Sequence, residues 1–241
     1  MKLLKRCITI FIVLISVLES CPQAMLIKLN SVNDESSLIV DKNINEKSDY
    51  LTINVKIPQI NGLDNKNVEK VINNKILDFT NMWIKDVREI ADEYYGAPNT
   101  VKPIYPYELT SKYTIKNQDK ILSFYTEYYQ FTGGAHGITN IIAYNIDIKS
   151  GKELLLKDLF IDGNTYKKII DKEIMNEINR NPDAYFSGKE GFIGIKENQQ
   201  YYIDGDNITI YFDEYEIAPY VAGIPKFEIP IKKFGNTFKY S

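Results

Sequence analysis

The feature that most limits the possible folds is a long amphipathic segment at residues 64–95. Its apolar side chains recur every three or four positions, which places them on one face of an α-helix. They are Val68, Val71, Ile72, Ile76, Phe79, Trp83, Val87, Ile90 and Tyr94. Asp64 is expected to cap the helix, and Gly96 and Pro98 to end it. Because a helix with one apolar stripe buries that stripe, Trp83 is expected to be a core residue rather than a sugar-binding platform.

Alternating apolar and polar residues predict β-strands on both sides of this helix. Residues 51–57 alternate before it, and Pro58 is expected to end that strand. Three strands are expected after the helix, and because only short turns join them, they should pair antiparallel. These three strands span residues 107–115, 121–131 and 141–148.

A second unit repeats the order of helix and strands. Asn164 or Thr165 is expected to cap its helix, and Pro182 lies beyond the helix end. The strands that follow are expected at 200–203, 208–212 and 227–231. The sequence therefore predicts an α+β fold of two packed subdomains, each a helix with an antiparallel sheet. The expected divisions are a signal peptide (1–24), a polar spacer with an edge strand (25–49), an N-terminal domain (50–152) and a C-terminal domain (153–241).

The first 24 residues predict export. A basic start, Met1 to Arg6, precedes an apolar run from Cys7 to Leu18. This run is shorter than the roughly 20 residues that a membrane-spanning helix needs, so a secretory signal peptide is predicted. The mature chain is expected to lack a membrane span and to be extracellular or at the cell surface. A lipoprotein anchored at Cys21 is the alternative, but Glu19 and Pro22 fit that pattern poorly.

The positions of the cysteines exclude a disulfide, and the net charge limits the classes of partner. Cys7 and Cys21 are the only cysteines, so the mature domain has no disulfide and depends on core burial for its stability. Removing residues 1–24 takes away three basic residues and one acidic residue, which moves the formal charge from -3 to -5. An acidic exported domain favours a cationic partner and excludes nucleic acid.

The only histidine, His136, lies in a glycine-rich turn between two predicted strands. A zinc site needs about three or four protein ligands, and without a second histidine or a cysteine pair no metal is expected. Thr132 is nearby, but no nucleophile-elbow pattern surrounds it. A strand follows the turn, which argues against a phosphate site at a helix N-terminus. His136 is therefore expected to anchor the loop to a neighbouring carbonyl, and no cofactor is expected.

Carboxylates and tyrosines leave other functions open. A polysaccharide hydrolase or deacetylase could combine His136 with a carboxylate, since glycoside hydrolysis needs only two acids at a fixed separation. A calcium site is a weaker alternative. The candidate acids are Asp204, Asp206, Asp213, Glu214 and Glu216. The chain also has 18 tyrosines, and exposed tyrosines beside acids are typical of protein-binding surfaces.

Several segments together resemble known proteins. They are Thr132-Gly-Gly-Ala-His-Gly137, residues 144–152 with 156–160, Glu197-Asn-Gln, and residues 211–223. In order and spacing they resemble the extracellular region of the RsiV family of anti-sigma-V factors, over residues 38–235. The first half also resembles the N-terminal domain attached to PdaC-type peptidoglycan deacetylases. The combination of these segments identifies the resemblance more specifically than any single segment does.

The resemblance implies an α+β pair of domains outside the cell, without a catalytic role. In the RsiV group this region is a receptor for lysozyme. Only six residues precede the apolar run, so no cytoplasmic sigma-binding segment is expected, and no deacetylase domain is expected to follow. The main hypothesis is a stand-alone binding module for lysozyme, another cationic wall-acting protein or peptidoglycan. A module with no ligand of its own is the third alternative. The expected binding residues are Gly133, Gly134, His136, Gly137, Tyr215, Glu216, Pro219 and Tyr220.

Overall fold

The computed structural model describes residues 37–161 and 165–240, and the predicted signal peptide, Asn164 and both cysteines lie outside these ranges. The N-terminal elements are β1 (Ile39–Lys47), β2 (Leu51–Ile60), α1 (Lys66–Tyr95), β3 (Tyr107–Gln118), β4 (Ile121–Phe131) and β5 (Ile138–Asp147). The later strands and α-helix are α2 (Thr165–Ile178), β6 (Tyr201–Asp204), β7 (Asn207–Tyr211) and β8 (Lys226–Pro230). Short 3-10 helices are η1 (Leu156–Leu159), η2 (Pro182–Ala184), η3 (Gly188–Glu190), η4 (Tyr220–Ala222) and η5 (Ile231–Thr237). No helix in the described ranges is long and apolar enough to cross a membrane.

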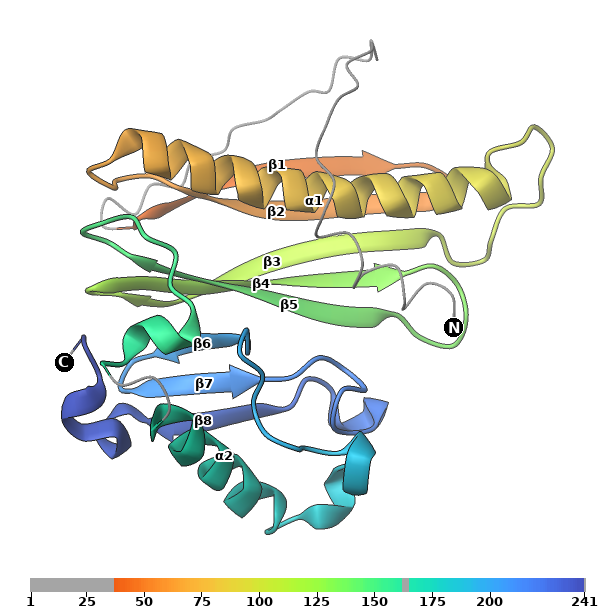
Figure 1. The fold of residues 1–241 in the computed structure, drawn as a ribbon. Coiled ribbons are helices and arrows are strands. Elements are labelled where there is room, and N and C mark those ends of the chain that lie inside the picture. Colours follow the sequence, from red (N-terminus) through yellow and green to blue (C-terminus); the bar gives the residue numbers. More distant parts are fainter. Residues whose placement is uncertain (1–36, 162–164, 241) are drawn as a thin grey trace.

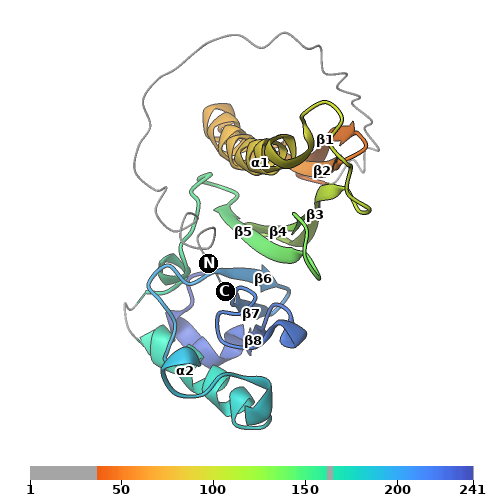
Figure 2. The same cartoon turned by 90° about the vertical axis from the view of Figure 1, so that its right-hand side faces the viewer.

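Two sheets and two α-helices form an α+β fold of two packed subdomains, as predicted. The larger sheet has the strand order β1-β2-β3-β4-β5, and the smaller has β6-β7-β8. The larger sheet curves around α1, and the smaller sheet packs on its opposite face, with α2 on the outer side (Figures 1 and 2). Helix, sheet, sheet and helix therefore form successive layers.

The larger sheet contains one pairing that the sequence did not predict. β2 and β3 pair in parallel, whereas every other pair in the two sheets is antiparallel. The chain passes through α1 between these two strands, and parallel neighbours need such a crossover connection. β2 also continues past Pro58 to Ile60. Its pairing with β3 stops at Val55, so one side of β2 has no sheet partner at Pro58 and the missing N–H is tolerated.

The buried face of α1 differs from the predicted stripe at its edges. Val71 and Tyr94 were expected in the stripe, but they are 67% and 62% exposed. The buried residues are Ile72, Ile76, Thr80, Ile84, Val87 and Ala91. Thr80 can be buried because its hydroxyl bonds to the Ile76 carbonyl and to the Tyr128 hydroxyl. Trp83 stacks on Tyr128 with ring centres 5.3 Å apart, so its predicted place in the core is confirmed.

The cap of α1 is Asn65, one residue later than predicted. The Asn65 side-chain oxygen accepts hydrogen bonds from the backbone N–H groups of Asn67 and Val68. These groups have no partner within the helix, so the side chain satisfies donors that would otherwise need water. Asp64, the predicted cap, lies outside the helix.

Removing this cap gives a direct stability test. We expect Asn65→Ala to lower the free energy of unfolding by about 1 kcal/mol, the usual cost of losing an N-cap. Asp64→Ala is the matched control and should change the free energy much less. Urea unfolding of the two variants measures both values. An equal loss in both would show that Asn65 does not act as the cap.

The second subdomain covers the outer edge of β5. The Tyr211 hydroxyl accepts a hydrogen bond from the Ala143 N–H (3.0 Å) and donates one to the Ile141 carbonyl (3.2 Å). The Thr139 N–H donates to Glu214 Oε2 at 3.3 Å. An uncovered edge strand can pair with other chains, so these side chains also protect the sheet from association. The two subdomains are therefore held together at β5.

A buried polar network reinforces the same junction. Asn145 accepts from the Ser123 hydroxyl (2.6 Å) and donates to the Tyr201 carbonyl (2.8 Å), and Ser123 accepts from the Ile203 N–H. Ser123 and Asn145 are 0% and 4% exposed. Buried polar groups favour one arrangement when all of them are paired, so this network fixes the position of the smaller sheet on the larger one.

Candidate functional site

The turn that carries His136 joins β4 to β5. Gly133 and Gly134 have φ angles of 90° and 91°, which side chains other than glycine rarely adopt. At Gly137 a Cβ atom would lie 2.5 Å from the ring of Tyr129, so the close approach of these two segments requires glycine. These glycines therefore shape the turn that presents the exposed His136.

His136 is held by its own loop, as the sequence predicted. Its Nδ1 lies 3.0 Å from the carbonyl oxygen of Gly137. A carbonyl oxygen can only accept, so this contact requires the proton on Nδ1. Unlike a buried structural histidine, His136 is exposed at the surface.

The second predicted segment, residues 211–223, runs from the end of β7 towards β8. Glu216 holds this segment in place. Its Oε2 accepts a hydrogen bond from the Asp213 N–H at 2.9 Å, and its Oε1 pairs with Lys196 at 2.5 Å. Tyr215 is held at φ 65°, an uncommon conformation for a residue with a side chain. Pro219 is followed directly by η4, in which Val221 is 92% exposed. The segment thus presents an apolar tip on a braced loop.

The structure brings these two segments together through aromatic stacking. The rings of His136 and Tyr220 lie 3.8 Å apart and are nearly parallel, at 18°. Tyr220 also stacks on Tyr215, with ring centres 5.6 Å apart. Its hydroxyl donates to the carbonyl of Gly137, 83 positions earlier in the chain, at 3.2 Å. We name His136, Tyr215, Pro219, Tyr220 and Val221 the His136–Tyr220 surface.

Charge near this surface is mainly acidic. Burial raises the pKa of the Glu214 carboxyl, while the hydrogen bond from Thr139 and the proximity of His136 oppose that shift. Asp213 and Glu216 lie in the same loop, and Lys196 pairs with Glu216. The rings of the surface therefore lie beside carboxylates.

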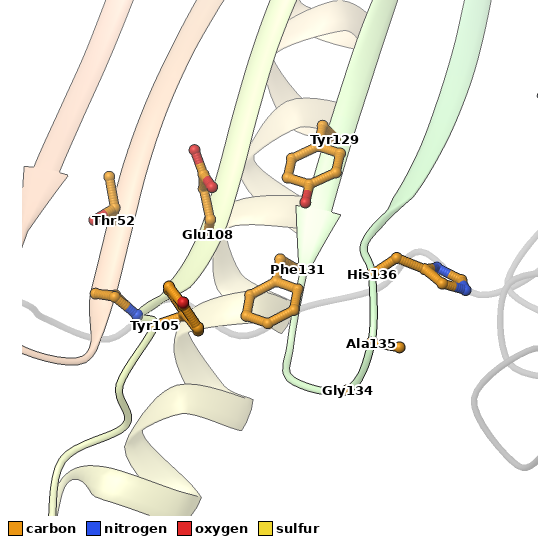
Figure 3. A pocket seen from close by; sticks show the side chains of 9 residues that line it. Thr52, Tyr105, Glu108, Tyr129, Phe131, Gly134, Ala135 and His136 are labelled. Carbon is orange, nitrogen blue, oxygen red and sulfur yellow. The ribbon is translucent and has the colours of Figure 1, made fainter.

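A recess lies beside the surface, on the face of the larger sheet away from α1. Its volume is about 420 Å³. Figure 3 shows the labelled side chains of Tyr105, Glu108, Tyr129 and Phe131 around it, with His136 turned away from them. The lining residues are Thr52, Tyr105, Pro106, Glu108, Tyr129, Phe131, Gly134, Ala135 and His136. The predicted turn therefore forms one wall of this recess.

The other predicted acids do not form a metal cluster. Asp204 pairs with Lys116 at 2.7 Å, at the junction between the sheets. Within residues 37–161 and 165–240, no three His, Cys, Asp or Glu side chains are grouped so that they could hold a metal ion. Asp206 and Asp204 lie in or beside the turn between β6 and β7, away from the His136 turn in sequence.

Sequence reasoning missed several residues around the site. They are Val221, which forms the exposed tip, and Glu108 and Tyr129, which line the recess. Glu214 was among the candidate acids, but its hydrogen bond from the Thr139 N–H was not expected. Alternation along β3 and β4 could have indicated that Glu108 and Tyr129 point away from α1. No local pattern could have placed Glu214 against the start of β5, because that contact joins distant parts of the chain.

Two segments of the chain are each similar to a known family. Residues 44–139 match the family described as Deacetylase PdaC, and residues 157–232 match Protein of unknown function (DUF3298). The two matched segments follow one another along the chain, the PdaC match first.

Particular relatives agree with this arrangement. The chain is 27% identical to the anti-sigma-V factor RsiV of Bacillus subtilis (strain 168) over 94% of its own length and 79% of that protein. It is 32% identical to the peptidoglycan-N-acetylmuramic acid deacetylase PdaC of the same organism, over 44% of this chain but only 23% of the deacetylase. The resemblance predicted from the sequence is thus confirmed. The relative matched over nearly the whole chain is an anti-sigma factor, whereas the similarity to the enzyme is confined to part of it.

Solved structures support the same fold. A DUF3298 family member from Bacteroides fragilis NCTC 9343 has a TM-score of 0.61 at 20% identity, covering 89% of this chain and 94% of that one. A DUF3298 family protein from Pseudomonas aeruginosa PAO1 has a TM-score of 0.57 at 17% identity, covering 84% and 93%. At these identities the similarity concerns the fold alone.

Proposed function

We propose that this chain is an exported, non-catalytic receptor module that binds lysozyme through the His136–Tyr220 surface. The observation that carries the proposal is the stack of His136, Tyr220 and Tyr215, which joins the two predicted segments into one exposed surface. Aromatic residues are enriched where protein interfaces contribute most binding energy. Because residues of both subdomains build this surface, it exists only when the two subdomains are folded and packed together.

Electrostatics favours a cationic partner. The chain has a formal net charge of -3, and Asp213, Glu214 and Glu216 lie in the loop that presents Tyr215 and Tyr220. Lysozyme is strongly basic, so opposite charges would steer the two proteins together and raise the association rate. The resemblance to the RsiV family supports the same partner, because it implies a lysozyme-receptor region.

The geometry of His136 supports binding over catalysis. One ring nitrogen contacts the Gly137 carbonyl, and one ring face lies against Tyr220. A general base needs an accessible nitrogen within reach of the proton that it removes, with an orienting group behind it. No carboxylate of the described chain hydrogen-bonds to this ring. Export by the predicted signal peptide would place the surface outside the cell, where lysozyme acts.

Calorimetric titration of the protein with lysozyme tests the proposal. We expect saturable binding with one lysozyme per chain at low salt, and weaker affinity as salt screens the opposite charges. Cytochrome c, another basic protein, is the control for unspecific charge attraction. Equal heat from both proteins, or none from lysozyme at low salt, would contradict the proposal.

A further inference from the structure

The recess beside the His136–Tyr220 surface is built by the register of three strands. Thr52 on β2 pairs with Glu108 on β3, and Glu108 pairs with Phe131 on β4, so these side chains form one row. Tyr129 lies two positions before Phe131 and points to the same face of the sheet. Tyr105, which is 73% exposed, closes the recess from the loop before β3.

A second hollow continues the recess along the sheet. This second hollow, of about 340 Å³, shares Tyr129 with the first. Within it, Lys112 and Glu127 form an ion pair at 3.2 Å. Because these two charges neutralise each other, the carboxylate of Glu108 is left as the negative charge of the recess.

Glu108 differs from the paired acids nearby. Its side chain is half-buried between aromatic neighbours, and its carboxylate has no hydrogen bond or ion pair with another residue in the described parts of the chain. Three rings, those of Tyr105, Tyr129 and Phe131, line the same recess. Aromatic faces attract organic cations, and a half-buried carboxylate strengthens this preference because less water competes for the charge.

We propose that this recess binds the ammonium or guanidinium group of one lysine or arginine side chain. The carboxylate of Glu108 would pair with the cation, and the rings would hold its apolar stem. The lysine or arginine would belong to the bound partner, so this step rests on the proposed function. A basic protein bound at the His136–Tyr220 surface would lie directly beside the recess. The recess would thereby fix the orientation of that partner.

An NMR titration with a small cation tests the recess without lysozyme. The probe is Nα-acetyl-lysine methylamide, and the norleucine analogue, which lacks the charge, is the control ligand. We expect saturable shifts of Glu108, Tyr129 and Phe131 with the lysine probe and none with norleucine. Glu108→Gln and Phe131→Leu should each weaken binding by about fivefold or more, because each removes one attraction for the cation. Glu93→Gln, the same change on the exposed side of α1, should have no effect.

Three results would overturn the recess proposal. They are equal shifts with the norleucine analogue, undiminished binding in Glu108→Gln, and shifts at these residues only with an N-acetylglucosamine trimer, which would make the recess a glycan site. The two proposals can fail separately. Lysozyme binding without a cation response would reject the recess alone, whereas a cation response without lysozyme binding would reject the proposed function alone.

Discussion

Replacing Tyr211 with alanine is expected to lower the free energy of unfolding by about 3–5 kcal/mol, the usual cost of truncating a large buried aromatic residue. Tyr211 is only 1% exposed and packs with Tyr125, Ile141 and Tyr202 where the two sheets meet. Its hydroxyl also pairs with the backbone of β5. The substitution therefore leaves a cavity and uncovers the edge of the larger sheet at once.

Two further variants separate these effects in urea unfolding experiments. Tyr211→Phe keeps the ring but removes the hydroxyl, so it should cost about 1–3 kcal/mol through the unpaired Ala143 N–H. Tyr94→Ala removes a tyrosine that is 62% exposed on α1, and it should change the free energy by less than about 0.5 kcal/mol. A Tyr211→Ala variant as stable as Tyr94→Ala would mean that the two sheets do not depend on this contact.

Replacing Tyr220 with alanine is expected to weaken lysozyme binding by about 30-fold or more. This corresponds to a loss of at least about 2 kcal/mol of binding free energy. The Tyr220 ring lies between His136 and Tyr215, and its hydroxyl bonds to Gly137. Without it, the His136 turn loses its ring stacking and its hydrogen bond with the segment that carries Tyr220. Calorimetric titration measures the change.

The comparison needs a control that removes the same chemical group elsewhere. Tyr94→Ala serves here too, because Tyr94 is exposed on α1 and should leave the affinity unchanged. Thermal unfolding of Tyr220→Ala should show a folded protein with only a small loss of stability from these contacts, so that weaker binding reports the surface rather than the fold. If Tyr220→Ala binds lysozyme as tightly as wild type does, the binding surface lies elsewhere on the molecule.

Local patterns predicted the elements because each pattern has a direct structural cause. The alternation in residues 51–57 reports a strand with one buried face, and the helical stripe of residues 64–95 reports a packed helix. Asn65 and Asp64 are equally good caps by type, so only the backbone geometry could decide between them. Val71 and Tyr94 were misplaced because both lie at the margin of the stripe, where packing against the sheet decides which side chains are covered.

Contacts between distant segments could not be derived in the same way. The parallel pairing of β2 with β3 depends on where the chain re-enters the sheet after α1. The periodicity of the sequence carries no information about this position. The glycine turn and the segment that contains Tyr220 were each predicted as candidate binding elements. Their stacking could not be foreseen, because it depends on how the smaller sheet packs on the larger one. Glu108 was missed for a related reason, since its neighbours Thr52 and Phe131 are brought to it by strand register.

The most direct test of the central claim is a titration of wild-type protein and His136→Ala with lysozyme at low salt, accompanied by an assay for glycan cleavage and acetate release on purified peptidoglycan. We predict one-to-one lysozyme binding that weakens in His136→Ala, and no turnover by either protein. Absence of binding by the wild-type protein, together with turnover that disappears in His136→Ala, would contradict the account.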